Sequence, residues 1–214
     1  DVFVGLGFTV AEGPEVEDDW HNFTALNFGE YHPARDMQDT FFVGLGGPRE
    51  VVMRTHTSPV QIRVMEHQRP PIYSIMPGRV YRNEATDATH LAVFHQLECL
   101  VVDRGITFGH LAGTIDMFTK AYFGPGWTSR LRPSYFPFTG PSAECDIQRP
   151  DGTWLELGGF GGGRPNGLAN CGIDPEEFSG FAFGFGLDRL AATRHGVTDL
   201  RELASTDIRF LEQF

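Results

Sequence analysis

Two β-strands joined by a loop are predicted by the stretch RVYRNEATDATHLAVFHQLECLVVD, residues 79–103. Its two ends, 79–84 and 93–103, are rich in β-branched and aromatic residues, and the middle holds Asn, Asp and Thr, which favour turns. Strands joined by a short connection pair in the antiparallel direction. We therefore expect this segment to form the centre of an antiparallel sheet.

Other short β-rich runs, most of them bounded by Gly, Pro or Asp, lie on both sides of this segment: 39–43, 51–56, 72–76, 129–133, 143–148 and 153–160. Several follow one another without an intervening helix, so the order is not the strict strand-helix alternation of a parallel doubly wound sheet. The fold class predicted is α+β, a largely antiparallel sheet covered by helices.

Helices are predicted at a few places between these runs. Residues 14–26 begin with Pro and acidic side chains, which suit a first helical turn. A second helix should begin at 57–59, where a hydroxyl side chain would cap it, and a third should cover 107–122. Residues 180–190 predict a short buried strand that leads directly into a helix bearing Arg189. Two amphipathic segments, 199–203 and 207–214, are expected to be packing helices.

Composition limits the class of protein. The 214 residues carry 17 Lys and Arg against 28 Asp and Glu, a formal charge of −11, and 41% are hydrophobic. This length suits one domain with a real core, and the acidic balance argues against broad, non-specific nucleic-acid binding. Three cysteines without CxxC spacing favour a reducing, cytoplasmic setting, and no apolar run is long enough to span a membrane.

The second strand of the opening segment carries candidate ligand-binding residues. Phe94, Gln96 and Glu98 alternate with the residues between them, so all three point to one face. An aromatic ring, an amide and a carboxylate make a plausible ligand floor, although a simply solvated face fits the spacing equally well. A metal site of His90, His95 and Glu98 is a weaker alternative, because His95 and Glu98 would face opposite sides of the strand.

Two further motifs allow more than one interpretation. The glycine-rich run 158–164 lacks the GxxxxGK[ST] pattern of a phosphate loop, so glycine there is expected to let the backbone approach a flat ligand or another strand. Phe136 and Phe138 are either core residues or the wall of an aromatic pocket.

Taken together, the motifs resemble the catalytic core of the bacterial phenylalanyl-tRNA synthetase α subunit family. The matching segments occur in the family's order and cover nearly the whole chain: 32–36, 54–61, 77–84, 87–90, 94–98, 132–138 and 180–184. The resemblance implies a class II aminoacyl-tRNA synthetase fold, an antiparallel sheet flanked by helices, over residues 1–214, without the family's N-terminal helical arm that contacts tRNA. Motif 1 would be the opening helix and following strand, motif 2 residues 79–103, and motif 3 residues 184–194.

The resemblance also implies a reaction. L-phenylalanine and ATP would give phenylalanyl-adenylate and pyrophosphate, and the acyl group would then pass to the 3′-terminal adenosine of tRNA(Phe), with Mg²⁺ as cofactor. Catalytic roles fall to Arg82, Arg189 and His90, and contacts to ATP to Arg82, Glu84, His90, Phe94 and Arg189. Residues implied to bind phenylalanine are His56, Ser58, Gln96, Glu98, Phe136, Phe138 and Ala182. Glu156 is implied as a magnesium contact.

Partners and alternatives follow from the same resemblance. The implied partners are the acceptor end of tRNA and either a β subunit or a second copy through motif 1. Three places depart from the family pattern: Cys99 and Gly140 stand where Gly and Glu are usual, and 161–165 replaces Gly-Met-Val-His-Pro. These departures keep open the alternative of a non-catalytic, synthetase-like module that retains the fold and the pocket.

Overall fold

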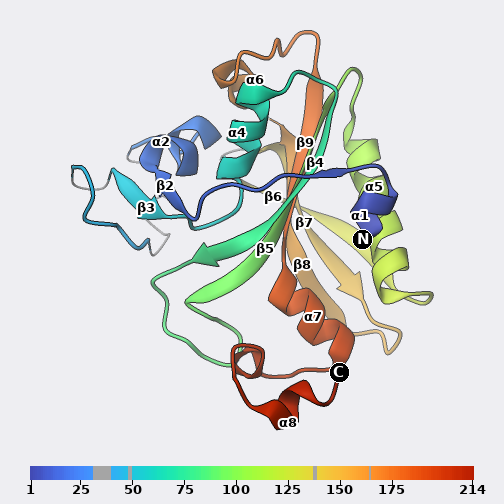
Figure 1. Ribbon diagram of the computed structural model, residues 1–214. Helices are drawn as coiled ribbons and strands as arrows, with labels where there is room; N and C mark the ends of the chain where they lie inside the picture. The colour runs from blue at the N-terminus through green and yellow to red at the C-terminus, as the bar shows by residue number, and fades with distance from the viewer. Residues whose placement is uncertain (31–39, 48–49, 137–138, 164) are drawn as a thin grey trace.

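A mixed sheet forms the centre of the protein. The computed structural model describes residues 1–30, 40–47, 50–136, 139–163 and 165–214, and they form a seven-stranded sheet (Figure 1). Its strands are, in spatial order, β1 (Thr9–Val10), β4 (Ile72–Tyr81), β5 (Val93–Asp103), β9 (Ser179–Gly186), β8 (Trp154–Gly163), β7 (Thr139–Gln148) and β6 (Thr128–Ser134). Only the short β1 pairs in parallel, with β4, and the other neighbours are antiparallel. The predicted α+β class is confirmed.

The segment 79–103 is the antiparallel pair expected from its sequence. The predicted strand 93–103 is β5 with the same bounds. The predicted runs 72–76 and 79–84 are not separate, because β4 continues through Pro77. The Ile75 carbonyl faces β1, where it accepts a hydrogen bond from Ala11. The backbone of Pro77 points to the same side as that of Ile75, but β1 does not extend that far. The N–H that proline lacks therefore has no strand partner to lose.

One face of the sheet is closed by aromatic packing. Helices α1 (Val2–Gly5) and α5 (Phe108–Phe123) cover it. Phe181, Phe183 and Phe185 alternate along β9 and point to this face, and the Phe118 ring of α5 stacks on Phe185 with centroids 4.8 Å apart. Alternation along the strand places Gly180, Ala182, Gly184 and Gly186 on the opposite face. The predicted helix 107–122 is confirmed, with a capping box at Thr107.

The opposite face is covered over only part of its length. Helices α4 (Pro59–His67) and α6 (Pro165–Asn170) and the 3₁₀ turn η1 (Thr24–Leu26) pack there. They bury Leu100 and Val102 of β5 together with Ala182 of β9. Helix α7 (Leu187–His195) follows β9 directly, which confirms the predicted strand-helix segment that carries Arg189.

The predicted helix 14–26 is wrong over its first half. Residues Val16–Asp18 form strand β2, which pairs with β3 (Val51–Met53), and only Asp19–Asn22 forms a helix, α2. The acidic residues have different roles: Glu17 is buried and receives two hydrogen bonds from Arg63, at 2.8 and 2.6 Å, whereas Asp18 caps the short helix α2. Pairing with a distant strand and this ion pair outweigh the local helix signal.

Other predicted elements are shorter than expected. The run 39–43 begins outside the described residues, and Phe42 makes one isolated bridge to Val52. The run 51–56 is a strand only to Met53. The C-terminal segments are single turns, η2 (Leu200–Glu202) and α8 (Ile208–Leu211), with no buried residues, so they are not packing helices. In each, an Asp at the N-cap accepts a hydrogen bond from the backbone N–H of an Arg two residues on and pairs with its side chain, which closes the turn locally.

No described helix combines the length and the apolar character that crossing a membrane requires.

Candidate active site

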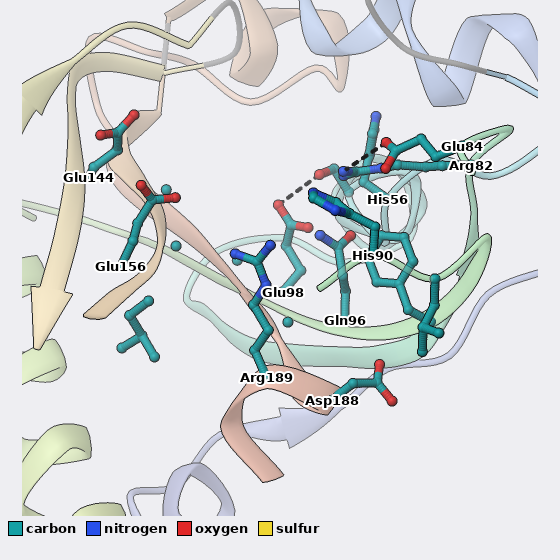
Figure 2. A pocket seen from close by; sticks show the side chains of 18 of the residues that line it. His56, Arg82, Glu84, His90, Gln96, Glu98, Glu144, Glu156, Asp188 and Arg189 are labelled. Atoms are coloured by element: carbon teal, nitrogen blue, oxygen red, sulfur yellow. Dashed lines mark hydrogen bonds and ion pairs between the residues drawn. The ribbon is translucent and has the colours of Figure 1, made fainter. Parts of the chain in front are cut away.

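A cavity of about 470 Å³ lies over the uncovered part of the sheet (Figure 2). Its floor comes from β5, β9 and β8, and its sides come from β7, the start of α7 and the loop after β4. Almost all the residues expected in the site line this one cavity: His56, Ser58, Arg82, Glu84, His90, Phe94, Gln96, Glu98, Phe136, Glu156 and Arg189. The expectation that Phe94, Gln96 and Glu98 share one face of β5 is confirmed, and this face lines the cavity.

Glycines make part of the floor flat. A Cβ atom on Gly158 would overlap the carbonyl of Gly184 on the neighbouring strand, and a Cβ on Gly159 would come within 2.6 Å of the Phe136 ring. Only glycine allows this close approach without displacing a neighbour. Residues 158–163 of the glycine-rich run belong to strand β8, and the expected close approach to another strand is confirmed, here with β9. The run also brings β8 against the Phe136 ring.

Glu98 lies at the deep end of the cavity and is 5% exposed. Its Oε1 accepts hydrogen bonds from the Ser58 hydroxyl at 2.7 Å and the Gln61 amide at 2.8 Å, and its Oε2 accepts one from Thr57 at 3.3 Å. Burial raises the pKa of Glu98 to about 7, although these hydrogen bonds favour the charged form. The helix predicted to begin at 57–59 is confirmed, with Ser58 as the N-cap residue and Pro59 as its first residue. The predicted hydroxyl cap is wrong, because Ser58 makes no capping hydrogen bond and its hydroxyl donates to Glu98 instead.

Two neighbours of Glu98 have unused hydrogen-bonding capacity. The Gln96 Oε1 and both ring nitrogens of His56 are buried and have no hydrogen-bond partner among the described residues. His56 packs on the Phe28 ring with centroids 6.2 Å apart, and burial lowers its pKa to about 3, helped by the charges of Arg82 and Arg54. A neutral imidazole has one acceptor nitrogen. This end of the cavity therefore offers acceptors to a ligand that donates hydrogen bonds.

The cavity also holds two cationic side chains, Arg82 and Arg189. The guanidinium of Arg82 lies 5.0 Å from the centre of the Phe94 ring, and its Nε donates to the Thr55 carbonyl at 3.3 Å. Burial lowers the pKa of Arg82, the carboxylate of Glu84 raises it, and the like charge of Arg189 lowers it further. Two arginines that repel each other across a cavity favour an anion between them. Figure 2 shows Arg189 pointing into the cavity from the start of α7.

His90 lies on a tight turn at the mouth of the cavity. The Asp87 carboxylate accepts hydrogen bonds from the backbone N–H groups of Thr89 and His90, at 2.7 and 2.8 Å. These bonds, led by those from Thr89, hold the pKa of Asp87 well below its usual range. The backbone N–H of Leu200 donates to the Ala88 carbonyl at 2.9 Å, so the C-terminal segment braces this turn.

A pair of carboxylates lies on the β7–β8 side of the cavity (Figure 2). Arg132 Nη2 lies 3.1 Å from a Glu144 oxygen and 3.8 Å from a Glu156 oxygen, while Arg132 also pairs with the buried Asp146 at 2.6 Å. Hydrogen bonds from Arg132 and Arg130 lower the pKa of Asp146. Two carboxylates that face one cation are hard oxygen donors, the chemistry that suits Mg²⁺.

The alternative metal site of His90, His95 and Glu98 is wrong. His95 is held by Asp188, whose carboxylate accepts from the His95 backbone N–H at 2.5 Å. Within the described ranges, the one group of side chains whose ligand atoms could meet around a metal is Glu17, Asp18 and His21. It lies outside the cavity, and its Glu17 is already bound by Arg63.

Some expected residues lie elsewhere. Ala182 does not line the main cavity but a second, small one of about 40 Å³, next to Leu100 and Gly180. Phe138, Arg164 and the segment 32–36 lie outside the described residues. Cys99 is buried in the aromatic core on the other face of the sheet, and Gly161 packs against Thr139 between β7 and β8.

Several residues of the site were not predicted from the sequence: Thr57, Gln61, Arg132, Glu144 and Leu200. The position of Gln61 had a signal, because it follows Ser58 by three residues and so lies on the same side of the first turn of α4. The position of Glu144 depends on the pairing of β7 with β8, which the sequence alone does not determine.

An antiparallel sheet whose open end holds two facing arginines, an aromatic ring and buried acceptors defines a class II synthetase-like core. A comparison with solved structures supports the fold: pyrrolysyl-tRNA synthetase from Desulfitobacterium hafniense superimposes with a TM-score of 0.71 over 96% of this chain and 70% of that one, at 21% identity. The family model for the tRNA synthetases class II core domain (F) matches residues 1–214, and the chain belongs to that family.

Curated relatives give a more specific similarity. The chain is 53% identical over its full length to the phenylalanine–tRNA ligase alpha subunit of Flavobacterium psychrophilum and 56% identical to that of Prochlorococcus marinus. It spans 66% and 62% of those two proteins.

Proposed function

We propose that this chain is the catalytic core of a phenylalanine–tRNA ligase. It activates L-phenylalanine with ATP and transfers the acyl group to the 3′-terminal adenosine of tRNA(Phe). The observation that carries this proposal is the combination of groups in one cavity: buried acceptors, Glu98 and the Gln96 Oε1 that has no partner among the described residues, together with two arginines, Arg82 and Arg189. An amino acid bound beside a polyphosphate needs both kinds of group.

The acceptor end suits the ammonium group of the amino acid. Glu98 supplies the negative charge, and Gln96 Oε1 and a His56 nitrogen supply neutral acceptors, while Ser58 fixes the carboxylate. Leaving these buried groups unpaired is costly, so a ligand that satisfies them gains binding energy. A cation also favours the ionised form of Glu98, whose pKa burial raises.

The aromatic ring of phenylalanine is assigned to the wall that Phe136 makes against Gly159. Phe138 and Ala182 complete this part of the proposal, with Ala182 at the small cavity behind the main one. Edge-to-face contacts between rings contribute about 0.5–1.5 kcal/mol per pair beyond the buried area.

The two arginines suit ATP. In the proposed reaction a carboxylate oxygen of phenylalanine attacks the α-phosphorus, and the bond from that phosphorus to pyrophosphate breaks. Arg82 would hold the α-phosphate and Arg189 the γ-phosphate, because a guanidinium binds phosphate oxygens bidentately and stays charged. Phe94 would stack on adenine, Glu84 would accept from its amino group, and His90 would lie near the phosphates. Catalysis is then mainly stabilisation of charge by groups already in place.

The carboxylates of Glu156 and Glu144 would hold Mg²⁺ beside the phosphates. When bound, the ion neutralises charge on the phosphate oxygens. Arg132, which already bridges both carboxylates to Asp146, keeps them together on this side of the cavity.

The proposal extends to partners and location. The acidic chain has few basic residues to spread over a tRNA, so it would contact only the acceptor end and bind tRNA weakly by itself. A β subunit, or a second copy through the region of β2 and β3, is the proposed protein partner, and the cytoplasm is the proposed location.

Phenylalanine-dependent ATP–pyrophosphate exchange tests the activity. We expect exchange with L-phenylalanine and much less with L-leucine, because only an aromatic ring fits the Phe136 wall. Analytical ultracentrifugation of the same sample gives the oligomeric state. A protein with native circular dichroism and no exchange would be a non-catalytic, synthetase-like module, and the proposed activity would be wrong.

A further inference from the structure

The two carboxylate oxygens of Glu98 have different surroundings. Oε1 receives two short hydrogen bonds, from Ser58 at 2.7 Å and from Gln61 at 2.8 Å. Oε2 receives one long hydrogen bond, from Thr57 at 3.3 Å. It lies beside Gly184, where it would be the nearest atom, at 3.6 Å, to a Cβ added to that glycine. A carboxylate has about four acceptor sites, so Oε2 keeps the larger unused capacity.

The proposed reaction assigns no role to the hydrogen-bond donor Gln61. Its side chain is 4% exposed and does not line the main cavity, so it cannot contact a ligand there. It lines the small cavity beside Ala182, and its amide Nε2 reaches Glu98 from that side. A long polar side chain buried on a helix that otherwise packs Ile62 and Met65 into the core needs a reason.

We propose that Gln61 is a positioning residue for Glu98: with Ser58, it fixes Oε1 against helix α4, so that Oε2 is presented to the cavity as the acceptor for the ammonium group of the amino acid. This inference rests on the proposed phenylalanine site. Two short hydrogen bonds on one oxygen restrain rotation of the carboxylate more than Ser58 and the long hydrogen bond from Thr57 would without Gln61. Pre-orientation of this kind lowers the cost of binding.

The amide also helps to keep Glu98 ionised. Hydrogen bonds from Ser58, Thr57 and Gln61 lower the pKa of Glu98 against the effect of burial, so removal of one donor raises this pKa. Other titratable or charged groups contact Glu98 or line its cavity: His56 before α4, Cys99 on β5, Arg82, Glu84 and His90 after β4, Glu144 on β7, Glu156 on β8, and Asp188 and Arg189 at the start of α7. Burial lowers the pKa of His56 to about 3 and raises the pKa of Cys99, so neither of these two neighbours changes charge between pH 6 and 9.

Replacement of Gln61 by Leu and by Met tests the role, since both keep the volume and remove the donor. Affinity for L-phenylalanine is measured by calorimetry from pH 6.5 to 9, KM for ATP and kcat come from exchange, and the Glu98 pKa comes from ¹³C NMR. We expect about tenfold weaker phenylalanine binding at pH 7, a deficit that shrinks toward pH 9, an unchanged KM for ATP, and a Glu98 pKa above that of the wild type. Gln68→Leu, at the exposed end of the same helix, is the matched control and should match the wild type.

The outcomes separate the two proposals. Wild-type affinity for phenylalanine in both Gln61 variants, or a loss that is the same at every pH and extends to ATP, would overturn the positioning role. A wild-type protein that binds no phenylalanine would remove the proposed function and this role with it. The NMR measurement is independent of the substrate, so an unchanged Glu98 pKa in both variants also contradicts the inference.

Discussion

Strand β5 passes through two different environments on one face of the sheet. Leu100 and Val102 lie under helix α4 and belong to the core, whereas Phe94, Gln96 and Glu98, on the same face, line the cavity. The backbone pairing is the same in both parts, antiparallel to β4 and β9. The difference comes from what lies above the strand.

This comparison separates stability from chemistry. The part of β5 under helix α4, and the aromatic core on the other face of the sheet, bury the apolar area that stabilises the fold. The open part keeps charged and unpartnered polar groups that cost stability until a ligand meets them. Glu98 lies at the boundary, where the first turn of α4 supplies its donors, Thr57, Ser58 and Gln61.

The largest effect is expected for the aromatic face of the sheet, which helices α1 and α5 close. Phe183→Ala removes a buried ring that contacts Phe160 and Phe185, so the free energy of unfolding should fall by about 3–5 kcal/mol. Phe136→Ala, on the cavity wall, should cost far less stability and raise the KM for phenylalanine. Urea denaturation of both variants measures this difference. Equal losses in the free energy of unfolding would contradict the distinction between the aromatic core and the cavity.

The next effect concerns the arginines of the open part. Arg189→Ala should lower kcat/KM for exchange by about 10²–10³-fold, because it removes a charge that is in place before the reaction. Arg194→Ala is the control: it lies on the same helix, but its guanidinium packs on Tyr122, 4.8 Å from the ring centre. Similar activity losses in both variants would show that the helix, and not the cavity charge, is what matters.

Glu98 should make the empty protein less stable as pH rises. Its folded pKa, about 7, is above the ordinary value of 4.5, so the folded state binds the extra proton between these values and stability falls as pH increases from about 4.5 to 7. Glu98→Gln removes this titration and should gain up to about 3 kcal/mol relative to the wild type at pH 8, with little gain at pH 4.5. His56 titrates in both proteins, so the difference between their urea curves isolates Glu98. A gain that does not depend on pH would be evidence against a buried, titrating carboxyl.

The smallest effect is expected at the small cavity. Ala182→Gly enlarges it and should admit para-chlorophenylalanine in pyrophosphate exchange, while costing about 0.5–1 kcal/mol of stability for glycine within a strand. Unchanged discrimination between phenylalanine and its para-chloro derivative would show that the ring does not reach Ala182.

Strong local patterns predicted much of this architecture. The alternation of residues 93–103 gave the bounds of β5 and the face of Glu98, and the strand-helix run 180–190 placed Arg189 correctly. The helix predicted at 14–26 failed because Val16–Asp18 pairs with a strand 35 residues later, a contact with no local pattern. The sequence at 57–59 predicts a hydroxyl cap for its own helix, whereas in the structure the Ser58 hydroxyl donates to Glu98. The sequence shows no local pattern for hydrogen bonds between polar residues that are far apart along the chain, so these contacts could not be predicted.

Proton release on phenylalanine binding tests the central claim, that Glu98 is held for an ammonium group. Calorimetry in buffers of different ionisation enthalpy measures the protons released per ligand. At pH 6 the wild type should release about one proton, because Glu98 is protonated in the empty cavity and ionised beside the ammonium, and at pH 8 it should release almost none. Glu98→Gln should release none at either pH. A wild type that binds phenylalanine at pH 6 with no more proton release than Glu98→Gln would contradict the claim.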